Sequence, residues 1–453
     1  MASTTDKHGM PDIKQPASFL GASFDCACGR RHEVPTRHVI YSPDAIDRIP
    51  SVLAPEITGR ACVVIADQRT RDVAGARVLR ALVDNGWTCR EIILPDPPGA
   101  HPVCNDHTHD WLARESGTAD VFIAVGSGVV NDLTKWVAHD RATPYAVVAT
   151  AASMNGYTAA NVAPTIRGVK CLIRAQAPVA VLAVPSIIEH APLEMTLSGF
   201  GDVIAKPMST ADWMMNHALF AEHYCPLCAG MITRIEPLYL DRPRLVRDRD
   251  PKAIKGLFDA LVYSGVAMTM MGTSAPASGG EHLFSHTLDM MSSVDGVPHD
   301  LHGRQVGLGT IFAAALYERI LDALSRGTAV PTAMPASIDA GFWKGLAPAV
   351  QDEYTDKIPR LTALRNLVDA GELGTRLDKA VRTRLKTPRE IASALEQAGA
   401  ARRLPDVNCS RDRARAAILH MHEIRKRPSV VDLAWTTGIL AREADALIDE
   451  WLV

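Results

Sequence analysis

Six short, almost wholly apolar runs in the first 190 residues constrain the fold more than any other feature of this sequence. They are HVIYS, ACVVIAD, CREIILP, DVFIAVGS, YAVVAT and VAVLAVP, each bounded by Gly, Pro, Asp or charged clusters. Such β-branched runs are typical of strands buried on both faces of a parallel sheet. Segments with helical periodicity, such as TRDVAGARVLRALVDNG and NDLTKWVAHD, lie between them. The alternation predicts an open, doubly wound, mostly parallel Rossmann-like sheet.

The pattern changes near residue 190. The later segments are long and helix-periodic without strand-like runs, as in GDVIAKPMSTADWMMNHALFAEHY, AIKGLFDALVYSGVAMTMMG and RQVGLGTIFAAALYERILDALSR. A chain of 453 residues also exceeds one ordinary core. We therefore expect an α/β domain over residues 1–190 and an all-α domain over residues 191–453. Charged helical sequence continues from about residue 360, where a solvated helical face explains the Arg and Glu residues.

Composition and charge narrow the class of protein. The formal net charge is -3 with both signs interspersed, so nothing indicates nucleic-acid binding. No apolar run reaches the roughly 18–20 residues of a membrane span, and the start, MASTTDKHGMPDIKQP, lacks the apolar segment of a signal peptide. Nine scattered cysteines fit a cytoplasmic protein with reduced thiols. Two pairs, Cys26 with Cys28 and Cys225 with Cys228, offer four ligands for a structural zinc; neither has a full zinc-ribbon spacing, so the favoured interpretation is no zinc site.

Two loops are candidates for binding a dinucleotide. In DVFIAVGSGVVNDLTKWVAH, a predicted strand turns into a predicted helix at Gly126, Ser127 and Gly128. Backbone amides and a helix N-terminus favour a pyrophosphate there, but a tight turn also needs glycine for steric reasons, and the run is not GxGxxG. The next loop, VVATAASMNGYTAA, offers Thr150 and Ser153 to a ribose or nicotinamide amide, or is a small-residue turn. Both loops would lie at the carboxyl edge of the sheet, where ligands bind in such folds.

Histidines define a third candidate site. In SGGEHLFSHTLDM, His282 and His286 are four residues apart and share one face of a helix, and His302 follows in LHGRQVG. With Asp202 of GFGDVIAK, His282 and His302 would form a set of one carboxylate and two imidazoles. Three protein ligands leave open positions for substrate, as in a catalytic metal site. These donors suit zinc, Fe(II), Ni(II) or Co(II); three unrelated polar residues are the alternative.

Several stretches together resemble the bacterial sn-glycerol-1-phosphate dehydrogenases, in the superfamily of iron-containing alcohol dehydrogenases, glycerol dehydrogenases and dehydroquinate synthases. They are VGSGVVNDLTK, TAASMNGYTA, GFGDVIAK, ADWMMNHALFAEHYC, SGGEHLFSHTLDM and LHGRQVGLGT, with CACGRRHEVPTR and ADQRT nearer the start. The similarity covers roughly residues 24–320, and the last hundred or so residues match less clearly. The resemblance implies a dehydroquinate synthase-like fold, an active site in the cleft between an α/β nucleotide-binding domain and a helical domain, and a homodimer or larger oligomer.

The resemblance also implies an activity, namely reversible hydride transfer between NAD(P)H and dihydroxyacetone phosphate to give sn-glycerol 1-phosphate, in phospholipid metabolism. The implied metal is one divalent ion, zinc first and nickel or iron as alternatives. The roles carried over are metal ligation by Asp202, His282 and His302; cofactor binding by Asp67, Gly126, Ser127, Gly128, Thr150 and Ser153; and substrate binding or catalysis by Asp132, Lys206 and His286. A carboxylate at Asp67, near the adenosine, would repel a 2′-phosphate, which slightly favours NAD over NADP.

Two departures from the family widen the choice of substrate. The family usually has TAASMDGYTS, whereas here Asn155 takes the place of the substrate-contacting aspartate and Ala159 that of the serine. Losing the carboxylate removes an acceptor and a charge beside the substrate hydroxyls. The alternatives are therefore a dehydrogenase of another small polyol or phosphorylated hydroxy-ketone, a dehydroquinate synthase-like lyase that regenerates its NAD, and a redox-silent relative that binds nucleotide and metal.

Overall fold

The computed structural model describes residues 11–97 and 101–453, so the signal-peptide prediction falls largely outside the described residues. By internal packing the chain forms two units. The first comprises residues up to Arg167, Cys171–Gly199 and Pro226–Thr273, and the second comprises Gly168–Lys170, Phe200–Cys225 and Ser274–Val453. These packing units are built from interleaved segments, whereas the sequence analysis places a single boundary at residue 190; that boundary stays a prediction.

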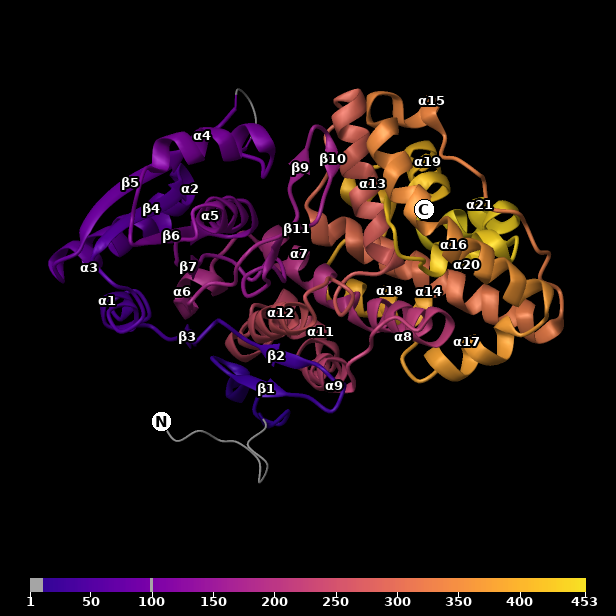
Figure 1. Ribbon diagram of the computed structural model, residues 1–453, viewed down its shortest axis with the longest axis horizontal. Helices are drawn as coiled ribbons and strands as arrows, with labels where there is room; N and C mark the ends of the chain where they lie inside the picture. Colours follow the sequence, from indigo (N-terminus) through magenta and orange to yellow (C-terminus); the bar gives the residue numbers. More distant parts are fainter. Residues whose placement is uncertain (1–10, 98–100) are drawn as a thin grey trace. The chain divides into compact units, whose positions relative to one another are not determined.

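A six-stranded sheet with the order β3-β12-β7-β6-β4-β5 forms the core of the first unit (Figure 1). All pairings within it are parallel. Its strands correspond to the six predicted apolar runs: β3 (His38–Tyr41), β4 (Ala61–Asp67), β5 (Thr88–Leu94), β6 (Val121–Gly126), β7 (Tyr145–Ala149) and β12 (Ala180–Ala183). Every residue of β6, β7 and β12 is buried, which explains the nearly continuous apolar character of these runs. The predicted fold class is confirmed.

Helices and small hairpins complete the first unit. The helices are α1 (Ile49–Leu53), α2 (Gln68–Thr70), α3 (Ala76–Asp84), α4 (Asp106–Ser116), α5 (Gly128–Asp140), α6 (Pro185–Glu189), α9 (Pro226–Ile235), α10 (Pro237–Leu240), α11 (Pro243–Arg247) and α12 (Pro251–Met271). The short strands β1 (Ser23–Asp25) and β2 (Arg31–Glu33) form an antiparallel hairpin beside α12, and β8 (Asn161–Val162) pairs with β11 (Ile173–Arg174) (Figure 1).

Helix α12 is a candidate membrane span by length and composition alone. It is apolar enough to cross a membrane, although Lys255 and Asp259 interrupt its apolar run. However, 83% of its apolar window is buried inside the molecule. This burial is what a core helix of a globular unit requires, because an all-round apolar helix must be covered on every side.

Apart from strand β10 (Val169–Lys170), the regular elements described in the second unit are helices. This unit contains the end of α7 (Leu193–Ile204), α8 (Lys206–Phe220), α13 (Gly280–Asp295), α14 (His302–Arg326), α15 (Ala340–Trp343), α16 (Ala347–Asp369), α17 (Leu373–Val381), α18 (Pro388–Ala398), α19 (Arg411–His420), α20 (Val430–Thr436) and α21 (Ile439–Trp451). Helices α13 and α14 pack together, and α18, α20 and α21 pack on α14. The short hairpin of β9 (Thr165–Ile166) and β10 (Val169–Lys170) reaches α13 through β10.

Candidate active site

Three side chains from three helices converge in the second unit. Asp202 lies near the end of α7, His282 in the first turn of α13, and His302 at the first residue of α14. One ligand atom from each lies within 4.8 Å of the other two. The structure therefore brings the three predicted metal ligands together.

Two glycine contacts allow these helices to approach so closely. A Cβ on Gly201 would come within 2.0 Å of the carbonyl oxygen of Gly303, and a Cβ on Gly309 would come within 2.1 Å of the carbonyl oxygen of Glu281. No side chain fits at either position, because the facing atom is backbone. Gly201, Gly303 and Glu281 are direct neighbours of the predicted ligands, and Gly309 packs against Glu281. Close packing of the helices therefore explains why GFGD and HGRQVGLG contain glycines.

The ring of His282 is oriented by the residue before it. His282 Nδ1 lies 2.9 Å from Glu281 Oε1, while Nε2 lies 3.5 Å from Asp202 Oδ1. Glu281 also accepts the Gly279 N–H at 2.7 Å. Since a carboxylate only accepts, Nδ1 carries a hydrogen, and Nε2 is the ring nitrogen that faces Asp202. The sequence analysis did not single out Glu281.

A hydroxyl and an amide orient His302 in the same way. His302 Nδ1 lies 2.9 Å from Ser285 Oγ, and this hydroxyl donates to Gln305 Oε1 at 2.8 Å. Because Ser285 has one hydrogen and gives it to Gln305, it must accept from His302 Nδ1. The Nε2 lone pair of His302 is therefore left for a ligand. Ser285 and Gln305 were not predicted from the sequence, because nothing local distinguishes them from ordinary polar helix residues.

We expect Ser285→Ala to lower the affinity of the centre for a divalent metal by about 10- to 100-fold, the usual effect of losing such an outer partner. The hydroxyl fixes the tautomer and the angle of His302, so its loss leaves the imidazole free to rotate. Zn²⁺ titration against a competing chelator measures the effect. Ser293→Ala on the same helix is the matched control, because its hydroxyl bonds to the Asp289 carbonyl. Equal affinities for both variants and the unaltered chain would contradict this role.

The protonation states at the centre suit a metal. Burial, together with the nearby His282, lowers the pKa of His302 to about 3. Burial alone would raise the pKa of Asp202, but the Lys206 ammonium and His282 bring it well below its usual value. One carboxylate and two imidazoles, with ligand atoms within 4.8 Å of one another, are the donors that a catalytic divalent ion takes. The residues present therefore fit the ion that the sequence predicts.

Lys206 is occupied by the protein itself. Its ammonium is fully buried and donates to Asp202 O at 2.8 Å, to Asp202 Oδ1 at 3.0 Å and to Ala277 O at 3.1 Å. An ammonium has three hydrogens, and all three have acceptors. Asp202 lies near the C-terminal end of α7, where the helix dipole disfavours a negative charge. The ammonium of Lys206 compensates the charge of this carboxylate. The predicted contact of Lys206 with substrate stays a prediction.

His286 and one further cation lie beside the centre. The His286 ring stacks on that of His302, with centroids 5.5 Å apart, and burial lowers its pKa well below the usual value. Its predicted roles in substrate binding and catalysis stay predictions. Lys170, on β10, also lowers the pKa values of both histidines, and its ammonium lies 3.6 Å from Asp289 Oδ2. No local sequence pattern marks Lys170.

The loop before α20 supports the turn that precedes α13. Arg425 is partly exposed and donates to the carbonyl oxygens of Ser278 at 3.0 Å and Gly279 at 3.1 Å, and Arg427 donates to the same Ser278 oxygen at 2.6 Å. This turn leads directly to His282. The extended C-terminal part, to which the sequence analysis attached no function, therefore helps to hold a metal ligand in place.

In the first unit, the predicted cofactor loops meet at the point where the strand order reverses. From β4 the chain passes to β5 on one side and then to β6 on the other. Asp67 ends β4 and Gly126 ends β6, so both lie at the carboxyl edge beside this switch point, where ligands bind in open α/β sheets. The backbone N–H of Thr150, just after β7, donates to the Gly126 carbonyl at 3.2 Å, and Ser153 is buried in the same loop.

The two glycines of the first loop differ in what they require. A Cβ on Gly126 would meet Val130 Cβ at 2.6 Å, which is a steric need within the protein. A Cβ on Gly128 would meet Met154 Cγ at 3.7 Å, an ordinary contact. Ser127 is the N-cap of α5, and its side chain makes no capping hydrogen bond. Packing therefore explains Gly126 but not Gly128, and the predicted contact of Gly128 with a ligand stays a prediction.

Asp132 lies beside the loop after β7, which also carries Asn155. A Cβ on Gly156, the neighbour of Asn155, would lie 3.5 Å from Asp132 Oδ1. The fully buried Lys135 holds this loop by donating to Gly156 O at 2.6 Å and Asn161 O at 3.1 Å, and burial lowers its pKa. Lys135 is a positioning residue that the sequence analysis missed, although it stands in the quoted NDLTK.

The carboxylate of Asp67 is already paired. It caps α2 by accepting the Thr70 N–H at 2.8 Å, and Arg69 Nη2 lies 3.1 Å from its Oδ2. Arg69 also bonds Asp96. An adjacent guanidinium offsets the charge that would repel a 2′-phosphate, so the slight preference for NAD inferred from Asp67 loses its basis.

Comparison with known proteins agrees with this fold and site. The family model of iron-containing alcohol dehydrogenases matches residues 40–192. Among solved structures, a probable glycerol dehydrogenase from Sinorhizobium meliloti 1021 has a TM-score of 0.60 at 14% identity and covers 92% of this chain and 97% of its own. An NADH-dependent butanol dehydrogenase from Thermotoga maritima has a TM-score of 0.57 at 13% identity, covering 90% and 97%. These structures share the fold of this chain, and the family model gives the class as the iron-containing type of alcohol dehydrogenase.

Curated relatives narrow the class to a family. Proteins named glycerol-1-phosphate dehydrogenase [NAD(P)+] are 33% identical over 352 residues in Geobacillus stearothermophilus and 32% identical over 357 residues in Geobacillus thermodenitrificans. Each alignment covers 76% of this chain, and 85% and 83% of the relative. The chain belongs to the glycerol-1-phosphate dehydrogenase family and is an NAD(P)-dependent alcohol dehydrogenase, which confirms the resemblance seen in the sequence.

Proposed function

We propose that this chain reduces dihydroxyacetone phosphate to sn-glycerol 1-phosphate with NAD(P)H and a divalent metal, and catalyses the reverse oxidation. The convergence of Asp202, His282 and His302, with each imidazole held at Nδ1 by a neighbouring side chain, carries the proposal. Relatives at about a third identity named for this substrate support it. Zinc is the first choice of metal, with nickel or iron as alternatives, because nitrogen and oxygen donors suit all three.

Each residue has a defined task in this scheme. When bound, the metal polarises the substrate carbonyl as a Lewis acid, and the reduced nicotinamide supplies the hydride. Asp202 contributes the negative charge, His282 and His302 contribute nitrogen donors, and Lys206 keeps Asp202 ionised and in position. His286, stacked on His302, exchanges the proton that the new alcohol needs.

The first unit supplies the cofactor loops and further substrate contacts. Gly126, Ser127 and Gly128 bind the pyrophosphate, and Thr150, Ser153 and Asp67 the rest of the cofactor. Asp132 and Asn155 contact the substrate hydroxyls. We further propose a cytoplasmic homodimer or larger homo-oligomer. Because Asn155 offers an amide where the family has a carboxylate, another small polyol or phosphorylated hydroxy-ketone is the second candidate for the substrate.

The test is net oxidation of NADH and NADPH by dihydroxyacetone phosphate, with chelator-treated protein and with protein resupplied with zinc or nickel. We expect turnover only after metal is returned. A dehydroquinate synthase-like lyase would show no net oxidation of the cofactor. Binding of cofactor without turnover of any hydroxy-ketone would contradict the proposal and favour the redox-silent alternative.

We propose that Lys170 binds the phosphate of the substrate. Its side chain is partly exposed, and its positive charge lowers the pKa values of both His286 and His302. We expect Lys170→Met to raise the KM for dihydroxyacetone phosphate about 10- to 100-fold, which corresponds to losing one charge-assisted hydrogen bond. Unphosphorylated dihydroxyacetone is the control substrate, and its kcat/KM should not change. A parallel loss for both substrates would show that Lys170 supports the fold of the site instead.

A further inference from the structure

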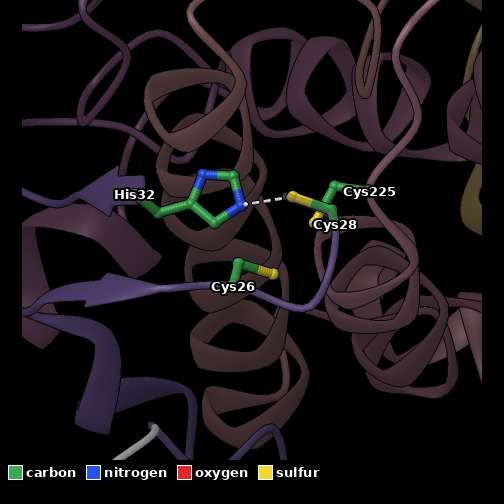
Figure 2. Close-up of side chains that lie close together, drawn as sticks. All are labelled: Cys26, Cys28, His32 and Cys225. Carbon is green, nitrogen blue, oxygen red and sulfur yellow. Dashed lines mark hydrogen bonds between the residues drawn. The ribbon is translucent and has the colours of Figure 1, made fainter. Parts of the chain in front are cut away.

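A second group of metal-type side chains lies outside the candidate active site. Cys26 and Cys28 lie in the turn of the β1–β2 hairpin, His32 is the middle residue of β2, and Cys225 immediately precedes α9. Figure 2 shows the four side chains turned toward one another. One ligand atom from each lies within 4.8 Å of the other three. The structure thus replaces Cys228, which the sequence analysis grouped with these cysteines, by His32.

The position of Cys225 is set by the first unit. It is the last residue of a segment assigned to the second unit, but its peptide bond joins it to Pro226, the first residue of α9. Helix α9 packs on α12, and β2 packs on the same helix. The hairpin and the start of α9 therefore share one support, which places the fourth ligand beside the other three.

A tight turn presents the two hairpin thiols. The Gly29 N–H donates to Cys26 O at 2.9 Å, and the Cys26 N–H donates to Arg30 O at 2.9 Å. Gly29 has a φ of +84°, a conformation that favours glycine. The sequence Cys-Ala-Cys-Gly is thereby folded so that both sulfurs lie near the ring of His32 (Figure 2).

His32 has the environment of a metal ligand. The side chain is fully buried, and Nδ1 lies 2.8 Å from the carbonyl oxygen of Met270 on α12. A carbonyl only accepts, so Nδ1 carries the hydrogen and Nε2 keeps its lone pair. That nitrogen lies 3.4 Å from Cys28 Sγ. On a tetrahedral zinc ion, a sulfur and a nitrogen ligand lie about 3.6 Å apart, given the usual bond lengths. A backbone carbonyl on the second ring nitrogen is also the usual partner of a zinc-bound histidine.

We propose that Cys26, Cys28, His32 and Cys225 bind one zinc ion as a closed structural site. Three thiolates and one imidazole complete a tetrahedral shell, which leaves no position for substrate. Binding releases the thiol protons and involves no change of oxidation state. The ion ties the N-terminal hairpin to the start of α9. This inference does not rest on the proposed function, because none of the four residues takes part in it.

Cobalt substitution of the full chain, purified under reducing conditions, tests the site. Thiolate ligands give Co²⁺ a charge-transfer absorption in the near ultraviolet, and the candidate active site has no thiolate. We expect this band in the unaltered chain, together with one zinc equivalent that persists in His282→Ala. Cys28→Ser and Cys225→Ser should each lose both the band and that equivalent. Cys228→Ser is the matched control, one helical turn further on, and should keep both.

Two results would overturn the proposal. One is the absence of the thiolate-to-Co²⁺ band in the unaltered chain, together with cysteine reactivity that is the same with and without Zn²⁺. This result uses no variant, so it does not depend on how well a variant folds. The other is a band that survives in Cys28→Ser and Cys225→Ser, or disappears in Cys228→Ser. A chain with the thiolate band but without dehydrogenase activity would keep the zinc site and reject the proposed function, so the two are tested separately.

Discussion

Replacing His282 by alanine is expected to lower kcat/KM by about 10³-fold or more, because a lost Lewis acid removes several kcal/mol of transition-state stabilisation. The reason lies in the donor set. His282 Nε2 faces Asp202, and the remaining two ligands cannot hold an ion with the affinity of three. Steady-state kinetics and metal analysis of the same preparations measure the two effects together. Binding of NADH, followed by its fluorescence, should be unchanged.

His190→Ala is the control, since this histidine is exposed and bonds to the Ser186 carbonyl of its own helix. It should keep full activity and metal content. If His282→Ala retained turnover at the level of the control, the metal centre would not be catalytic. Loss of turnover with full metal content would instead give His282 a role other than ligation.

Replacing Lys206 by methionine is expected to give the largest loss of stability. Removing one partner of a buried ion pair costs about 3–5 kcal/mol, because the other charge stays buried without compensation. Both Lys206 and Asp202 are essentially inaccessible to solvent, with side-chain exposures of 0% and 1%. For a unit of this size the melting temperature should fall on the order of 10 °C in metal-free protein. Added zinc should restore part of the loss, because a cation again faces Asp202.

Calorimetry of metal-free and zinc-loaded protein, with substrate kinetics, separates the two roles of Lys206. A positioning role predicts the loss of stability and its partial recovery. A contact of Lys206 with the substrate, as the family resemblance implies, would instead leave the melting temperature unchanged and raise the KM for dihydroxyacetone phosphate. Lys255→Met is the control, because this lysine forms an exposed pair with Asp259, worth at most about 1 kcal/mol.

The fold was largely predictable because burial leaves a local record. A strand covered on both faces must be apolar at nearly every residue, and β6, β7 and β12 are buried along their whole length. The helical second half has an equally local signal in its periodicity. What the periodicity could not show is that helices α9–α12 pack in the unit of the sheet while α8 does not. An apolar helical face indicates that a helix is covered, but not by which neighbour.

The candidate sites divide in the same way. Asp202, His282 and His302 were found because ligand residue types stand in short motifs beside glycines, and the structure gathers them. The Cys26-x-Cys28 pair was also visible. His32 was not chosen, since nothing local distinguishes a ligand histidine from a buried one, and Cys228 was grouped with Cys225 by spacing alone.

The sequence by itself determined the parallel sheet, the helical second half, the family and the choice of three candidate metal ligands, because each depends on residue types over a short stretch. Only the tertiary structure decided what orients those ligands: Glu281 on His282, Ser285 on His302, and the three hydrogen bonds of Lys206. It also chose His32 over Cys228 for the cysteine cluster. These choices depend on which side chains face each other after residues distant in the chain pack together, and packing geometry has no local counterpart in the order of the residues.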